Sequence, residues 1–134
     1  MSGKIAARPI RAEEISVVRA LLQGMQNAAG FIAELYVAVV TDMPDGQMGG
    51  IVFVSDRQEG RRFGEVLGDA EFFDVDGVKV VISLYLDNFG QLYELDFWKT
   101  DFSPLRRYPD PADLRPVEAV SKAELIARMT GRQR

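Results

Sequence analysis

Carboxylates, one ammonium and two large aromatic side chains alternate with apolar residues through the centre of the sequence. The residues concerned are Asp69, Glu71, Lys79, Tyr85, Glu94, Asp96 and Trp98. Side chains alternate between the two faces of a strand, so residues spaced by two share one face of a sheet. Carboxylates gathered in this way could bind a hard cation through oxygen ligands, transfer protons, or attract a basic protein. These residues are therefore the candidate site.

Two residue types that carry much of protein chemistry are absent. The chain of 134 residues contains no cysteine and no histidine. Thiolate chemistry, zinc sites built on cysteine or histidine, and a serine–histidine–aspartate triad are excluded. Catalysis would rest on carboxylates, lysine, tyrosine, serine or threonine alone. We expect no cofactor, and we favour a binding function over an enzymatic one.

Charge is unevenly distributed along the chain. Residues 65–101 carry two bases and nine acids, net −7, whereas residues 102–134 carry seven bases and four acids, net +3. The whole chain has a net charge of −4, which argues against nucleic acid as a partner because phosphate contacts need clustered lysine and arginine. An acidic region of this kind would instead steer a basic protein partner.

The sequence contains no membrane or export signal that we can identify. No apolar run approaches the roughly 20 residues that cross a bilayer, and the N-terminus lacks the apolar segment of a signal peptide. We expect a cytoplasmic protein that does not bind a membrane.

Hydrophobic periodicity predicts the elements that position the candidate residues. Ile15, Val18 and Leu22 repeat at helical spacing, which indicates an amphipathic helix from about Ala12 to Gln26. Alternation and β-branched residues indicate strands in the next part of the chain. The expected strands begin near Leu35 and then cover Ile51–Ser55, Phe63–Asp74, Val78–Leu86 and Gln91–Thr100.

Strand register follows from the pairing that keeps one sheet face apolar. A three-residue loop with Gly77 in the left-handed conformation pairs Ala70 with Ile82 in one hairpin. A four-residue loop pairs Ile82 with Leu95 in the next hairpin. The residues of the last strand expected in the core are Tyr93, Leu95 and Phe97. The candidate residues then occupy the opposite face, with Glu71 and Asp96 in one row, Asp69 and Glu94 in the next, and Lys79 beside Trp98.

These elements predict a single α+β domain over residues 1–134. Its core covers about residues 8–108, where the N-terminal helix packs on an antiparallel β-meander of about five strands. Residues 109–134 form a proline-rich extension that ends in a short helix, introduced by the capping-box pattern Ser121–Glu124. This terminal helix would dock on the body of the domain or on another subunit.

The candidate face has more than one interpretation. Its simplest explanation is a solvent-facing surface whose charges follow strand alternation. Large aromatics on a wet face usually have a cover, however, so Trp98 and Tyr85 indicate coverage by the chain's own tail, by the first two strands or by a partner. The function we favour is a non-enzymatic protein-binding module that uses this acidic face. The alternatives are a carboxylate-based divalent-cation-binding protein or metal-dependent enzyme, and a structural homo-oligomer formed through the C-terminal segment.

Three segments carry a resemblance to a known group of sequences: residues 45–50, residues 72–78 and residues 92–105. They resemble an uncharacterised family of small bacterial proteins with a DGGMGS-like turn and a closing ELDxWKxDFSPL-like strand, over roughly residues 8–108. This sequence departs from the family at Gln47 and Gly50, where the family has glycine and serine. The family supplies no catalytic role for any residue. The resemblance implies an immunity-like or adaptor-like protein.

Overall fold

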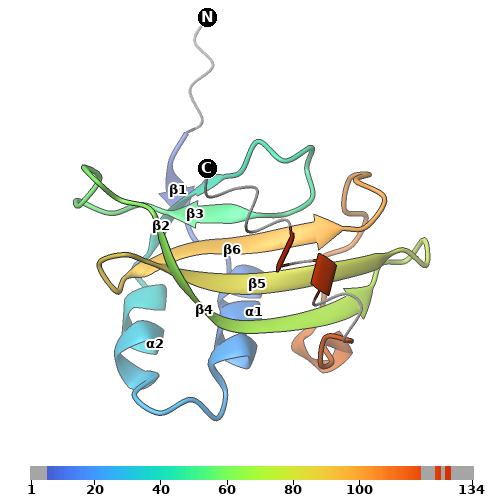
Figure 1. Cartoon of the computed structure of the whole chain (residues 1–134), viewed down its shortest axis with the longest axis horizontal. Coiled ribbons are helices and arrows are strands. Elements are labelled where there is room, and N and C mark those ends of the chain that lie inside the picture. Colours follow the sequence, from blue (N-terminus) through green and yellow to red (C-terminus); the bar gives the residue numbers. More distant parts are fainter. Residues whose placement is uncertain (1–5, 119–122, 125, 128–134) are drawn as a thin grey trace, which may run out of the picture.

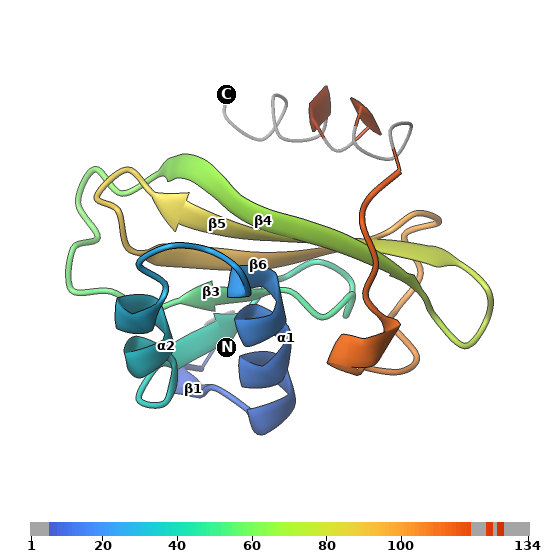
Figure 2. The same ribbon diagram turned by 90° about the horizontal axis from the view of Figure 1, so that it is seen from below.

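The computed structural model describes residues 6–118, 123–124 and 126–127. Within them the chain forms an α+β domain, a six-stranded antiparallel sheet with two helices packed on one face (Figures 1 and 2). In chain order the elements are β1 (Arg8–Pro9), α1 (Ala12–Leu22), α2 (Ala29–Leu35), β2 (Val39–Asp42), β3 (Ile51–Phe53), β4 (Phe63–Phe73), β5 (Lys79–Asp87), β6 (Leu92–Lys99) and the 3₁₀ helix η1 (Pro111–Asp113). The strands lie side by side in the order β1-β2-β3-β6-β5-β4.

The hydrophobic core lies between the helices and one face of the sheet. Apolar residues from α1, α2 and alternate positions of β5 and β6 meet there. The fully buried members include Val17, Val18, Leu35, Val80, Ile82, Leu84, Leu95 and Phe97. Burying side chains of this size is worth about 1.5–3 kcal/mol each, which makes this layer the main source of stability.

Three features of the N-terminal half differ from the sequence-based expectation. Helix α1 ends at Leu22 rather than near Gln26, because Gly24 adopts a φ of 82° that suits a helix C-terminus. The segment before β2 forms the short helix α2, so the strand expected from about Leu35 begins only at Val39. The expectation of about five strands also missed β1, whose Pro9 stands in an edge strand where proline is tolerated.

The first long hairpin has the predicted register. Ala70 pairs with Ile82 and Phe72 with Val80, and Gly77 has a φ of 81°. This hairpin confirms that the apolar face selected the pairing correctly.

In the second hairpin the predicted register is wrong by two residues. Ile82 pairs with Phe97 rather than Leu95. A shift of two keeps every side chain on its face, so the apolar pattern cannot detect it. A bulge between Tyr85 and Leu86 lets Leu86 pair with Leu92. The loop between the two strands is therefore one residue shorter than the shift of two alone would make it. The bulge leaves Tyr93, which was expected in the core, only half-buried, and Leu92 pairs with Leu86 in the core instead.

The C-terminal part of the chain crosses to the face of the sheet that the helices leave uncovered. After η1, the chain passes the outer edge of β4, and residues 123–124 and 126–127 lie over the face opposite α1 and α2 (Figure 2). The expected terminal helix falls largely outside the described residues, but these four residues have helical backbone. No helix of the described part of the chain is long and apolar enough to span a membrane.

Candidate functional site

The candidate residues lie on the face of β4, β5 and β6 that points away from the helices. The observed register places Glu71, Val81 and Trp98 in one row across the three strands, and Asp69, Ser83 and Asp96 in the next. Tyr85 pairs with Glu94 in a third row. Each row differs from its expected composition by the two-residue shift in β6.

Lys79 does not lie beside Trp98. It pairs with Phe73 at the far end of the hairpin, and its carbonyl oxygen accepts a hydrogen bond of 2.9 Å from the backbone N–H of Thr100. Its ammonium lies 2.9 Å from Glu118 Oε1 and 3.6 Å from Glu71 Oε2. Lys79 thus joins the sheet face to the C-terminal segment.

The face is not a solvent-facing surface. Trp98 is 5% exposed, Asp96 4% and Tyr85 1%, and the side chain of Glu71 is fully buried. Carboxylates lose strong hydration on burial and need a compensating charge or hydrogen bonds. The simplest interpretation of the sequence pattern, charges that merely face water, is therefore wrong.

The chain's own segment 115–118 provides part of the cover. Arg115 and Glu71 exchange backbone hydrogen bonds of 2.9 and 3.0 Å, so the segment adds one antiparallel bridge to the outer edge of β4. Val117 packs on Val81 and Trp98. The backbone N–H of Glu118 donates to Glu71 Oε1 at 3.1 Å.

Glu71 is the point at which these contacts converge. Its second carboxylate oxygen, Oε2, lies 3.6 Å from Lys79 Nζ and 3.8 Å from Arg115 Nε. The hydrogen bond between Lys79 and Glu118 raises the pKa of the lysine and lowers that of the glutamate. Both groups are therefore charged near neutral pH, and the ion pair holds the segment against the sheet.

Ser83 lies in the centre of this face, between β4 and β6. The hydroxyl of Ser83 is fully buried and has no hydrogen-bond partner among the described residues. It lies in the row between Asp69 and Asp96. A buried hydroxyl without a partner is costly, and it marks a place where a ligand atom or water would be stabilised.

The geometry does not favour a metal centre. Among the described residues, no group of three or more carboxylates is arranged to hold a metal ion. The acids of the candidate face are spread over three rows of the sheet, with Glu71 in one, Asp69 and Asp96 in the next and Glu94 in the third.

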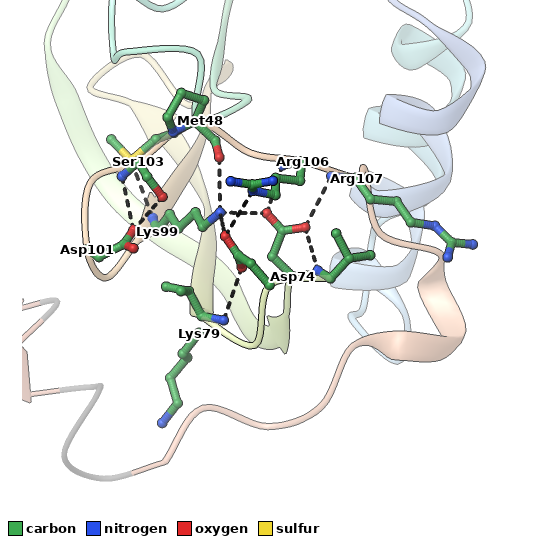
Figure 3. Close-up of polar contacts among 12 residues, drawn as sticks. Met48, Asp74, Lys79, Lys99, Asp101, Ser103, Arg106 and Arg107 are labelled. Atoms are coloured by element: carbon green, nitrogen blue, oxygen red, sulfur yellow. Dashed lines mark hydrogen bonds and ion pairs between the residues drawn. The ribbon is translucent and has the colours of Figure 1, made fainter.

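A second polar cluster, which sequence analysis missed, is centred on Lys99 (Figure 3). The lysine is fully buried, and its Nζ donates to Asp74 Oδ2 at 2.9 Å, Asp76 Oδ2 at 2.6 Å and the carbonyl of Pro104 at 3.0 Å. These three bonds use all three donors of an ammonium. Burial alone would lower the pKa of Lys99, but the two carboxylates outweigh it and raise the pKa. The amine stays protonated, so it cannot serve as a base or nucleophile.

Asp74 ties this cluster to the segment that follows β6. It accepts hydrogen bonds from the backbone N–H groups of Arg106 at 2.7 Å and Arg107 at 3.1 Å (Figure 3). Burial favours a higher pKa for Asp74, but Lys99 and these N–H donors hold the pKa below its usual value. The cluster fixes the chain after Lys99 to the hairpin turn between β4 and β5. This role is structural.

The glycine-rich turn, residues 45–50, is also explained by packing. The carboxylate of Asp45 accepts from the backbone N–H of Met48 at 3.0 Å and of Gly50 at 3.1 Å. These amides are therefore not available to cradle a phosphate. The carbonyl of Gln47 accepts from the N–H of Leu105 at 3.0 Å, which joins this turn to the closing strand motif.

Arg61 forms a third buried cluster, between β3 and β6. Its guanidinium donates to the carbonyls of Phe53 at 2.7 Å and Leu92 at 3.0 Å, and to Asp87 Oδ2 at 2.8 Å. It also lies 4.7 Å from the ring centroid of Tyr93. Arg61 therefore links β3 to β6 beyond the residues at which the two strands pair.

Comparison with known proteins identifies the family. Residues 7–109 match a family described as Domain of unknown function (DUF6984), and the chain belongs to this family. No curated protein and no solved structure matches the chain. The matched range includes the whole sheet and the Lys99 cluster, and it ends before segment 115–118.

Proposed function

We propose that this protein is a non-enzymatic protein-binding module that engages a basic partner through the acidic face of β4, β5 and β6. The observation that carries the proposal is the segment 115–118, which is already docked on this face through Glu71, Val81 and Trp98. A face that holds a segment of its own chain has the shape and polarity to hold a similar segment of another protein.

The chemistry of the face supports a basic partner. Glu71, Glu94 and Asp96 place three carboxylates on this face, and Glu71 already lies beside two cations, Lys79 and Arg115. Residues 65–101, which form most of this face, carry a net charge of −7. Such a charge accelerates the approach of a basic protein and disfavours an acidic one.

The aromatic residues supply the apolar part of a binding surface. Trp98 packs against Val81 in the row that begins at Glu71, and Tyr85 lies two rows away. Tryptophan and tyrosine are the residues most often found at the centre of protein interfaces, where they bury a large area at a small cost in side-chain entropy. An apolar centre with acids around it suits a basic amphipathic segment.

The family assignment separates the face from its cover. The face lies within residues 7–109, which are common to the family, whereas segment 115–118 lies beyond them. The binding surface in this proposal is therefore a property of the family domain. In this proposal the protein acts in the bacterial cytoplasm as an immunity-like or adaptor-like protein.

Charge neutralisation on the face tests this proposal. The full chain is used as bait, a retained partner is identified, and its affinity is measured by calorimetry with Glu94→Gln/Asp96→Asn. Affinity should fall by about tenfold or more, because truncating a buried charge pair costs at least 2 kcal/mol. The matched control, Asp56→Asn/Glu59→Gln, removes the same charge from an exposed loop and should leave the affinity unchanged. Equal affinity for wild type and both variants would show that the partner binds elsewhere.

A further inference from the structure

We infer that the face recognises an extended segment of a partner. The segment has a basic residue, an aliphatic residue two positions later and then a residue with a backbone N–H. Residues 115–118 of the chain itself occupy this site in cis. The inference rests on the proposed function, since it names the partner chemistry of the same face. It also assigns the C-terminal extension a role as a built-in competitor.

The first recognition element is the outer edge of β4. This strand ends the sheet, and the N–H and carbonyl of Glu71 point outward to the backbone of Arg115. Adding a strand to a free sheet edge is a general mode of peptide recognition, in which backbone hydrogen bonds supply affinity for any sequence. The bridge at Glu71 fixes the register of the bound segment.

Side chains of the bound segment then supply specificity. The Arg115 guanidinium lies 4.6 Å from the ring centroid of Phe73, and its Nε lies 3.8 Å from Glu71 Oε2. A cation above an aromatic ring and beside a carboxylate is stabilised by both. This position of a partner therefore selects arginine or lysine.

The next positions select against charge and against proline. Val117 packs on Val81 and Trp98, an apolar surface that would not accept an ionised side chain. The N–H of the following residue, Glu118, donates to Glu71 Oε1, so a proline at that position would leave this carboxylate oxygen without its donor. The resulting recognition pattern has four positions. The first is a basic residue, the second is any residue, the third is aliphatic and the fourth is any residue except proline.

The surroundings leave room for a partner larger than the cis segment. A hollow of about 420 Å³ adjoins the bridge and is lined by parts of α1, β4 and segment 115–117, including Leu21, Gly68 and Asp69. The buried hydroxyl of Ser83, in the same row as Asp69, is a further group that a partner could satisfy.

Tethering makes the cis segment a strong competitor. A segment joined to its site by a short linker has an effective concentration in the millimolar range. A partner in trans binds only the fraction of molecules in which the cis segment has left, and its apparent affinity falls by that fraction. Weakening the cis contacts should therefore strengthen binding in trans.

The test uses the full chain and a fluorescein-labelled peptide of residues 111–127, with binding followed by anisotropy. Val117→Asp places a carboxylate against Trp98 and should release the cis segment, so this variant should bind the peptide about tenfold or more tightly than wild type. Ala112→Asp adds the same charge at an exposed position of η1 and should bind the peptide as wild type does. Arg115→Pro is a second releasing variant, which removes both the N–H that donates to Glu71 and the guanidinium beside the Glu71 carboxylate. It lowers the net charge by one, as Val117→Asp and Ala112→Asp do, so Ala112→Asp controls for charge in both releasing variants. Equal peptide affinity in wild type and both releasing variants would overturn the inference.

Peptide variants test the recognition pattern and separate the two proposals. A peptide carrying Val117→Asp should lose binding to the released chain, and undiminished binding would overturn the pattern. If the released chain ignores the native peptide but its basic partner still depends on Glu94 and Asp96, this inference fails while the proposed function stands. If the peptide binds but no partner depends on those acids, the proposed function fails while the cis recognition stands.

Discussion

Arg115 and Glu71 exchange two backbone hydrogen bonds across the outer edge of β4, at 2.9 and 3.0 Å. This pair attaches the C-terminal extension to the family domain at the same residue whose carboxylate lies on the acidic face. The attachment turns a sheet surface with acidic and aromatic residues into an interface within one chain. It also indicates how that interface would be opened, since the contacts that hold the described part of the segment are few. They are the backbone bridge, the apolar contact of Val117, two ion pairs, the hydrogen bond from the Glu118 N–H and the contact of Arg115 with the Phe73 ring.

The Lys99 cluster should be the most sensitive polar site for stability. Asp74→Asn removes the fully buried carboxylate that accepts from Lys99 and from two backbone N–H groups. Breaking a buried ion pair typically costs about 3 kcal/mol or more, so the urea midpoint should fall markedly. Asp101→Asn is the control, because Asp101 is exposed and, within the described part of the chain, accepts its side-chain hydrogen bonds from Ser103. Equal midpoints for the two variants would mean that the cluster contributes little.

Protonation of Asp74 and Asp87 should lower the stability of the fold in acid. The pKa values of Asp74 and Asp87 are held below the usual 3.8, despite burial, by Lys99 and Arg61 respectively and by backbone N–H donors. A lowered folded-state pKa stabilises the fold above the unfolded value, and the stabilisation disappears as the pH falls through the folded-state pKa. Urea unfolding between pH 7 and pH 2.5 should show this loss below about pH 4. The Asp74→Asn variant should have a flatter profile, and an unchanged slope would contradict the assignment.

Arg61 should be structural rather than merely charge-balancing. Arg61→Met removes the donors to Phe53, Leu92 and Asp87 and leaves a buried carboxylate without its cation. We expect a loss of about 3 kcal/mol in the free energy of unfolding. Arg62→Met, at the neighbouring exposed position, should change it by less than about 0.5 kcal/mol. Similar losses for both would indicate a general charge effect.

The glycine-rich turn offers a stabilising substitution. Gln47 has a φ of 65°, a left-handed conformation that costs a residue with a side chain about 1–2 kcal/mol. Gln47→Gly relieves this cost but increases the entropy of the unfolded chain, so we expect a net gain of about 0.5–1 kcal/mol. Gln23→Gly is the control, since Gln23 has a φ of −61°. This variant should be less stable than the wild type or equally stable. A thermal melt that ranks the two variants in the opposite order would contradict this explanation.

An apolar face predicted which side of a strand lies in the core, but it did not always predict which residues pair. Alternation from Ala70 to Ile82 set the first hairpin correctly, because a slip of one residue would have buried acids. The same criterion failed between Ile82 and Leu95, because a slip of two exchanges one apolar residue for another. The bulge at Tyr85 has no local sequence signal, so the position of Tyr93 could not be predicted.

The sequence pattern could have indicated the Lys99 cluster, but not the pairing of Glu71 with Arg115. Leu95 and Phe97 face the core, so alternation would have placed Lys99 on the same face, where a lysine must find acids. Asp74 and Asp76, in the adjacent hairpin turn, were the nearest candidates. By contrast, nothing in the pattern of β4, β5 and β6 indicates that Glu71 pairs with Arg115, since a single bridge between distant segments depends on the path of the whole chain.

Acrylamide quenching of Trp98 tests the central claim, that the chain's own extension covers the acidic face. It is the only tryptophan in the sequence, so its fluorescence reports on this face alone. In the wild-type chain Trp98 is 5% exposed, and quenching should be weak, with emission at short wavelength. Val117→Asp should increase the quenching constant severalfold, whereas Ala112→Asp should leave it unchanged. Strong quenching in the wild type, or no increase with Val117→Asp in a folded protein, would contradict the account.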